Sequence, residues 1–284
     1  MTATITLNNG VKMPQVGFGV FQIMDLKQCE EAVLTAIETG YRNIDTASAY
    51  MNERAIGDAV RKSGIKREEI FITTKLWIQD ASYEKAKIAF DKSLNELQMD
   101  YIDLYLIHQP FADVYGAWRA MQELYKAGKI KAIGVSNFQP DRLVDLSVNN
   151  EIVPMVNQIE INPFQQQQNT QKLIEDNNTI VESWAPFAEG KNNIFKNELL
   201  TNIGKKYNKT VAQVILRWLL QRNIVMIPKS VHGERIQENF NIFDFELSNQ
   251  DMEQIKTLDT GESMFLSHND VATVRNLNGW KIHE

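Results

Sequence analysis

The sequence predicts an α/β fold: a (β/α)8 TIM barrel with an N-terminal β-hairpin and an additional C-terminal helix and tail. Short apolar, β-branched runs alternate eight times with amphipathic segments, which predicts parallel strands connected by helices. Eight such units in 284 residues match a closed barrel better than an open doubly wound sheet. Because no linker or composition break divides the chain, we expect one domain over residues 1–284.

The glycines of the first predicted strand also favour the barrel. The run "GFGVFQ" from Gly17 holds only two glycines of the G-x-G-x-x-G fingerprint that usually opens a dinucleotide-binding open sheet. A strand missed or invented in the count would instead favour the open sheet, so the prediction depends on all eight runs being strands.

The chain begins with a predicted hairpin and then supplies the strands in order. In "ITLNNGVKM", Asn9-Gly10 separates two strand-like arms, which is a strong short-range signal for a hairpin turn. The predicted strands that follow span residues 16–21, 41–47, 69–76, 101–108, 129–136, 154–161, 179–186 and 223–230.

Helix start and stop signals fall between these runs. Asp25 with Gln28, and Ser248 with Asp251, resemble capping boxes, the second more closely. Glycines suited to helix C-termini stand at positions 40, 64 and 128. The single cysteine, Cys29, falls in line with apolar residues at helical spacing, where we expect a small buried hydrophobe.

Composition and charge restrict the possible partners. Hydrophobic residues make up 43% of the chain, and the formal net charge is −6 without a basic run that would attract nucleic acid or anionic lipid. The first residues lack the pattern of a signal peptide, and no apolar stretch approaches the ~18 residues of a membrane span. We therefore expect a cytoplasmic protein, a monomer or weak homo-oligomer, that binds neither nucleic acid nor membrane.

Polar residues close three consecutive predicted strands. Asp45 ends the second, Lys75 the third and His108 the fourth, and Tyr50 lies five residues beyond Asp45. Reactive groups of a (β/α)8 barrel project from the C-terminal strand ends, and neighbouring strands are ~4.8 Å apart, so these side chains should converge. Each residue alone is more often a packing, turn or surface residue, and it is their convergence that predicts a site.

This group of residues can make a phenol acidic. An ammonium ~4 Å from a phenolate favours ionisation by about 4 kcal/mol at an effective dielectric of ~20, which predicts that Lys75 lowers the pKa of Tyr50. Asp45 would hold Lys75 charged, and His108 could orient a substrate oxygen. The four histidines show no metal-ligand spacing, so no metal is expected. A barrel hydrolase or isomerase acting through Asp45 and His108 is an alternative.

Several motifs together resemble the aldo-keto reductases over nearly the whole chain: "NIDTASAY", "TTKLW", "DLYLIH", "IGVSNF" and "IPKS" with a following Arg-x-x-Glu-Asn. The likeness is closest to the branch described as diketogluconate or methylglyoxal reductases. The resemblance implies hydride transfer from a nicotinamide cofactor to a carbonyl compound, with Tyr50 as proton donor, Lys75 and Asp45 tuning it, and His108 orienting the carbonyl. A regulatory subunit that binds nicotinamide on the same barrel is the second alternative.

The resemblance also implies the cofactor-binding residues. Ser136, Asn137 and Gln158 match the positions that bind the nicotinamide carboxamide, and Trp184 matches the aromatic on which the ring stacks, a role for which a flat indole is suited. The other end of the cofactor would be bound by Lys229, Ser230, Arg235, Glu238 and Asn239. A cation such as Arg235 in the first turn of a helix opposes the helix dipole unless an anion compensates it, which favours NADPH, with its 2′-phosphate, over NADH.

Two residues depart from the common pattern of these proteins. Met51 stands where a glycine is frequent, and a positive φ there would cost methionine ~1 to 2 kcal/mol, so the loop could run differently. Gln109 stands where tryptophan is common and replaces an apolar wall with an amide. Together with Phe21, Trp77 and the tail near His268 as walls, this predicts an open, fairly polar pocket for small carbonyl substrates.

Overall fold

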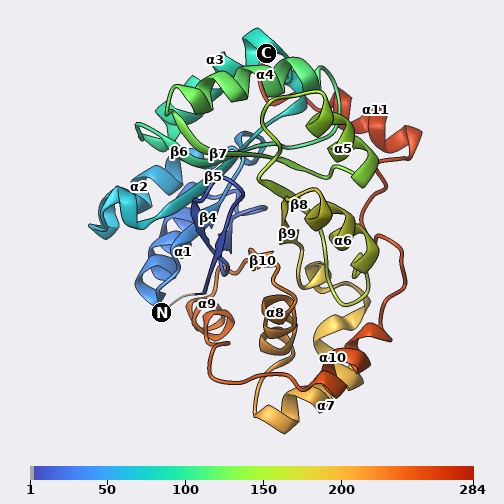
Figure 1. Cartoon of the computed structure of the whole chain (residues 1–284). Coiled ribbons are helices and arrows are strands. Elements are labelled where there is room, and N and C mark those ends of the chain that lie inside the picture. The colour runs from blue at the N-terminus through green and yellow to red at the C-terminus, as the bar shows by residue number, and fades with distance from the viewer. Residues whose placement is uncertain (1–2) are drawn as a thin grey trace.

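The structure is a computed structural model that describes residues 3–284 and shows a parallel eight-stranded barrel surrounded by helices (Figure 1). From β3 to β10 each strand pairs in parallel with the next one along the chain. The strands are β3 Phe18–Gly19, β4 Asn43–Asp45, β5 Phe71–Leu76, β6 Ile102–Ile107, β7 Ile130–Ser136, β8 Val156–Glu160, β9 Ile180–Trp184 and β10 Val225–Met226. The predicted barrel and its eight strands are confirmed, although β3 and β10 are shorter than the runs that predicted them.

Glycines at the first strand allow the barrel to close. The backbone N–H of Gly17 donates to the Met226 carbonyl at 2.8 Å, and that of Gly19 donates to the Pro228 carbonyl at 3.2 Å. A Cβ added to Gly19 would lie 2.9 Å from the Ile227 carbonyl oxygen, so a larger residue would push the two edges apart. The pair of glycines in "GFGVFQ" therefore serves the joint between β3 and β10.

The predicted hairpin covers the N-terminal end of the barrel. Strands β1 (Thr4–Thr6) and β2 (Lys12–Pro14) pair antiparallel, with a turn that has Gly10 at φ 87°. The Asn8 side chain donates to the carbonyl of Asn178 at 3.0 Å, just before β9. The hairpin is confirmed, and its turn binds to the loops that lead into the strands.

The helices follow the strands as the barrel pattern requires. They are α1 Leu26–Thr39, α2 Glu53–Ser63, α3 Tyr83–Leu97, α4 Val114–Lys126, α5 Pro140–Val148, α6 Gln168–Asp176, α7 Glu198–Tyr207, α8 Val211–Gln221, α9 Gly233–Phe240, α10 Asn249–Lys256 and α11 Val271–Gly279, with 3-10 turns η1 Ser48–Tyr50, η2 Arg67–Glu69, η3 Ile78–Asp80 and η4 Ala188–Lys196. Within residues 3–284, none is long and apolar enough to cross a membrane.

The helix ends agree with the predicted caps only in part. Asp25 and Ser248 each accept a hydrogen bond from the backbone three residues on, but neither forms the reciprocal bond of a complete capping box. A complete box forms at Thr210 and Gln213, which sequence reading missed. The predicted C-terminal glycines are confirmed: all three have positive φ. Cys29 is fully buried against the core, as predicted.

The C-terminal segment returns to the barrel mouth. After α11, which lies at the periphery of the barrel (Figure 1), the chain returns to the segment that follows β5. There the indole N–H of Trp77 donates to the Trp280 carbonyl at 2.9 Å, and His283 pairs with Asp80 at 2.8 Å. The predicted C-terminal helix and tail are therefore present, and the tail forms part of the wall above the strand ends.

Candidate active site

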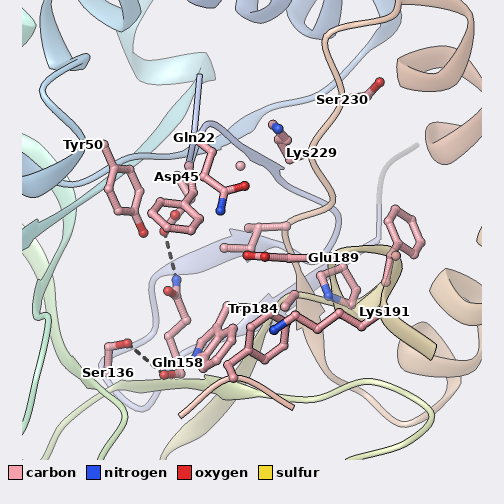
Figure 2. A pocket seen from close by; sticks show the side chains of 18 of the residues that line it. Gln22, Asp45, Tyr50, Ser136, Gln158, Trp184, Glu189, Lys191, Lys229 and Ser230 are labelled. Carbon is pink, nitrogen blue, oxygen red and sulfur yellow. Dashed lines mark hydrogen bonds between the residues drawn. The ribbon is translucent and has the colours of Figure 1, made fainter. Parts of the chain in front are cut away.

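The C-terminal ends of the strands open into a cavity of about 1030 Å³ (Figure 2). Most of the predicted site residues line it. They are Phe21, Asp45, Tyr50, Trp77, His108, Gln109, Ser136, Asn137, Gln158, Trp184, Lys229, Ser230, Arg235, Glu238 and Asn239. Lys75 lies beneath this surface and is completely buried. The structure thus brings together residues from the C-terminal ends of the strands, from the segments that follow them and from α9.

An ion pair between Lys75 and Asp45 forms the base of the site. The Lys75 Nζ lies 2.6 Å from Asp45 Oδ1 and also donates to the Thr46 carbonyl at 2.9 Å. Burial is the largest single effect on Lys75 and would lower its pKa, but the charge and hydrogen bond of Asp45, together with the charges of Tyr50 and Glu182, outweigh burial, and the net pKa is raised. Burial raises the pKa of Asp45, although Lys75 and Gln158 act against the rise. The ammonium is therefore fixed in position and remains charged.

Tyr50 reaches the Lys75 ammonium from a tightly held loop. Its hydroxyl lies 3.5 Å from Lys75 Nζ, and the side chain belongs to η1. The Ser48 hydroxyl donates to the Lys75 carbonyl at 2.9 Å, which ties the loop to β5. Met51 follows with φ 58° and an exposed side chain, so the position does require a left-handed backbone. Methionine occupies it in place of glycine without redirecting Tyr50.

The expected effect of Lys75 on the Tyr50 pKa is only partly correct. Lys75 does lower the pKa, yet burial of the phenol raises it by more, so the net pKa lies above its ordinary value. The prediction that Lys75 brings the pKa of the phenol toward neutral pH was wrong, because the desolvation of Tyr50 in the barrel mouth has a larger effect than the attraction to Lys75. A phenol that remains protonated is nevertheless the form that can donate a proton.

His108 faces the same part of the cavity as Tyr50. Its ring lies edge-on to Tyr50, with centroids 5.6 Å apart, and edge-on to Trp77, with centroids 5.2 Å apart. Burial, with a smaller effect from the Lys75 charge, holds the pKa of His108 well below its ordinary value, so the imidazole is neutral. Its Nδ1 is buried with no hydrogen-bond partner among residues 3–284, which leaves Nε2 as the ring nitrogen that can meet a ligand.

A hydrogen-bonded group on β7, β8 and β9 lies across the cavity from Tyr50. The Trp184 indole N–H donates to Asn137 Oδ1 at 2.9 Å, and Asn137 Nδ2 donates to the His108 carbonyl at 3.1 Å. The Ser136 hydroxyl donates to the Gln158 carbonyl at 2.9 Å, and Gln158 Nε2 donates to Asp45 Oδ2 at 2.9 Å (Figure 2). The N–H and O–H groups of these side chains therefore already donate hydrogen bonds within the protein. Their oxygen atoms can still accept hydrogen bonds from a ligand. Acceptors suit a ligand NH2 group.

The far end of the cavity is cationic. Lys229 and Arg235 have exposed side chains that line it, and no carboxylate within residues 3–284 lies within ion-pair distance of either. Arg235 stands in the first turn of α9, as predicted, and the N-cap residue, His232, makes no side-chain cap. The uncapped helix start, with Arg235 in its first turn and Lys229 four residues before it, favours an anion, although Glu234 in the same turn acts against this. Glu238 instead accepts from the Thr210 hydroxyl at 2.8 Å.

The predicted substrate pocket has both apolar and polar walls. Phe21 lies against Tyr50, with ring centroids 4.9 Å apart. The side chain of Gln109 accepts from His268 Nε2 at 2.6 Å, and burial lowers the pKa of His268 to about 4, so this imidazole is neutral and donates. Trp280 of the tail and Trp77 are edge-on, with centroids 5.1 Å apart. The amide of Gln109 is therefore built into the wall by a residue of the C-terminal segment.

Sequence reading missed two contributors. Phe265 lies edge-on to Trp184, with centroids 5.3 Å apart, and only the folded tail brings it there. Glu182 is fully buried on β9, and its Oε2 accepts from Gln158 Nε2 at 2.9 Å. The run "IVESW" held a signal for Glu182, because alternation places it on the same inward face as Trp184, where a carboxylate is unusual.

The fold and this cavity define a class: a (β/α)8-barrel oxidoreductase with an acid–base cluster at one end of its cavity and an anion-binding end at the other. The chain belongs to the aldo/keto reductase family, whose profile matches residues 15–260. It is 50% identical over 260 residues to glyoxal reductase of Bacillus subtilis, covering 91% of this chain and 94% of that protein.

Solved structures agree with this assignment. An aldo-keto reductase from a Medee basin deep-sea metagenome library superposes with a TM-score of 0.91 at 44% identity, covering 94% of this chain and 99% of that one. An aldo-keto reductase of Bombyx mori, solved in complex with NADP, superposes with a TM-score of 0.90 at 32% identity, covering 97% of each chain. The fold is therefore shared along nearly the whole length.

Proposed function

We propose that the protein is an NADPH-dependent reductase of small aldehydes, ketones or dicarbonyl compounds, with Tyr50 as the proton donor. The observation that carries the proposal is the contact of the Tyr50 hydroxyl with the buried Lys75–Asp45 pair at 3.5 Å, next to the neutral imidazole of His108. The relatives support the substrate class, since one is a glyoxal reductase.

Residues of this chain fit the cofactor. Trp184 offers an indole held in place by Asn137, against which a nicotinamide ring can stack. The side-chain oxygens of Ser136, Asn137 and Gln158 can each accept a further hydrogen bond, which suits the carboxamide NH2. Lys229, Ser230 and Arg235, beside the uncapped start of α9, suit the 2′-phosphate. When bound, the reduced dinucleotide supplies the hydride for the carbonyl carbon.

The chain's own residues then manage charge and protons. His108 and the Tyr50 hydroxyl bind the carbonyl oxygen and hold it facing the cofactor site. As the oxygen gains charge, Tyr50 donates its proton to it, and Lys75 stabilises the phenolate that remains. Asp45 keeps Lys75 charged throughout. The preformed Lys75–Asp45 ion pair needs no rearrangement during proton transfer, and this lowers the free-energy barrier of that step.

The two alternatives have weaker support. A hydrolase or isomerase that uses Asp45 and His108 has no need of the cationic end at Lys229 and Arg235, and Asp45 is already engaged by Lys75 and Gln158. A nicotinamide-binding regulatory subunit would have no need of the Tyr50, Lys75 and His108 arrangement. Tight NADPH binding without turnover of any carbonyl would nevertheless favour the regulatory subunit.

The test is turnover of a panel of small aldehydes, ketones and dicarbonyls by wild type and Tyr50→Phe, followed by the loss of reduced cofactor. The variant should retain cofactor affinity and lose on the order of 10²-fold or more in turnover, because general acid catalysis contributes about that much. Tyr125→Phe, on α4 outside the site, is the matched control and should behave as wild type. An unchanged rate for Tyr50→Phe would refute the proton-donor assignment.

A further inference from the structure

Glu182 is a buried carboxyl group that the proposed mechanism does not use. It lies on β9, two residues before Trp184, with no exposed surface. A single nitrogen, Gln158 Nε2, donates to Glu182 Oε2 at 2.9 Å and to Asp45 Oδ2 at 2.9 Å. The other carboxyl oxygen of Glu182, Oε1, has no hydrogen-bond partner in the part of the chain that the structure describes. Glu182 is thus connected to the Asp45–Lys75 pair through one amide group.

The charges around Glu182 do not balance if every group is ionised. The titratable groups that act on it or on its neighbours are Asp45 on β4, Lys75 on β5 and Tyr50 on η1; β8 and β10, which flank it, present Gln158 and Val225 at its level. One cation would then face two carboxylates. An unpaired carboxylate in a buried site is costly, and Lys75 already contacts Asp45.

A proton on Glu182 removes this imbalance. Burial, and after it the negative charge of Asp45, raise the pKa of Glu182 to about 8. The protonated side chain is uncharged, so its unpartnered oxygen costs less than a bare carboxylate would. Both N–H bonds of the Gln158 side chain then point to Asp45 and Glu182. The side-chain oxygen of Gln158, Oε1, remains as an acceptor for a ligand in the cavity.

We propose that Glu182 is a positioning residue that holds a proton at neutral pH and thereby keeps Tyr50 a competent proton donor. The inference rests on the proposed function of Tyr50. Glu182 does not pass on its proton: in the reaction the Tyr50 O–H bond breaks, an O–H bond forms on the substrate oxygen, and Tyr50 recovers its proton from solvent. The part that Glu182 plays is electrostatic.

The direction of the effect follows from the charges. Burial is the main cause of the raised pKa of Tyr50, and an ionised Glu182 would add a smaller further rise, which would make Tyr50 a weaker acid. With a pKa of about 8, roughly a tenth of Glu182 is ionised at pH 7 and roughly nine-tenths at pH 9. Proton donation to the carbonyl should therefore slow as the pH rises through this range. The cause is the ionisation of Glu182 and not that of Tyr50.

The first experiment measures single-turnover reduction of methylglyoxal by the NADPH-loaded protein, compared at pH 7 and pH 9. The wild-type rate should fall several-fold more than that of Glu182→Gln, which mimics the protonated acid and cannot ionise. Glu160→Gln is the matched control: Glu160 is a buried carboxyl on β8 that hydrogen-bonds Asn162 and Ser263 and has no contact with Gln158 Nε2. The rate of Glu160→Gln should fall between pH 7 and pH 9 as much as the wild-type rate does. Equal pH dependence in wild type and Glu182→Gln would overturn the proposal.

A second measurement needs no activity. The folded pKa of Glu182 lies above its unfolded value, so its contribution to stability is fully present below the unfolded pKa and is lost as the pH rises toward about 8. The Tm of wild type should therefore fall relative to that of Glu182→Gln between pH 5 and pH 8. A constant Tm difference, or a Glu182→Gln protein that fails to fold, would show that the native site needs an ionised carboxylate and would overturn the proposal.

The two proposals can fail separately. If Tyr50→Phe keeps full turnover, the proton-donor assignment is wrong, and the role of Glu182 in catalysis is overturned with it, whatever the Tm series shows. If Tyr50→Phe is inactive and the profiles of wild type and Glu182→Gln coincide, only the role of Glu182 is overturned.

Discussion

Replacing Lys75 with methionine should destabilise the protein by an amount that depends on pH. The substitution removes the cation 2.6 Å from Asp45 and leaves that carboxylate completely buried without an opposite charge. At an effective dielectric of ~20 the lost attraction is about 6 kcal/mol, and part of it is offset because no ammonium has to be buried. Breaking a buried pair in this way typically costs about 3 to 5 kcal/mol.

The pH dependence of stability follows from the difference between the pKa of Asp45 in the folded variant and in the unfolded chain. Without Lys75, burial leaves the folded-state pKa of Asp45 above the unfolded value of ~3.9. The folded variant then binds more protons than the unfolded chain, so its stability is fully present below that value and falls by about 1.4 kcal/mol per pH unit as the pH rises toward the folded pKa. The variant should therefore be closest to wild type at acid pH.

The assay is urea unfolding of wild type, Lys75→Met and the double variant Lys75→Met/Asp45→Asn, followed by tryptophan fluorescence at pH 5 and pH 7.5. The double variant has no unpaired charge and should recover most of the loss at pH 7.5, with little pH dependence. A Lys75→Met protein within about 1 kcal/mol of wild type at pH 7.5, or a loss that is the same at both pH values, would refute the reasoning.

Two further predictions concern the cofactor end and the Tyr50 loop. Arg235→Ala should weaken NADPH binding by about 10- to 100-fold, the usual worth of a charge-assisted hydrogen bond, and leave NADH binding nearly unchanged; titration by fluorescence tests this, with exposed Glu234→Ala as control, and equal losses for both cofactors would count against a 2′-phosphate contact. Met51→Gly should raise the free energy of unfolding by ~0.5 to 1 kcal/mol, because relief of the positive φ of 58° exceeds the added freedom of the unfolded chain. Met51→Ala keeps the unfavourable backbone and should gain nothing; a glycine variant no more stable than the alanine variant would contradict the explanation.

Much of the site could be predicted because barrel geometry places strand ends together. Asp45, Lys75 and His108 close successive strands, and any parallel barrel brings such residues to one mouth. Glu182 was missed although it lies on the inward face of its strand, because a carboxyl inside an apolar run gives no indication of its partner. Gln158 Nε2 donates to Glu182 from the neighbouring strand β8, and it also donates to Asp45, which is 113 residues away from Gln158 in the sequence.

The sequence by itself determined the barrel, its order of strands and the residue types at its mouth, because periodicity and strand-end positions are local properties of the chain. Only the tertiary structure decided the sign of the Tyr50 pKa shift, since burial and the Lys75 charge oppose each other and their balance depends on packing. The same holds for the wall formed by Gln109 and His268, which lie 159 residues apart and meet only when the tail folds over the mouth. Met51 is an example of both. The sequence shows a methionine where glycine is frequent, and only the structure shows that its φ is positive.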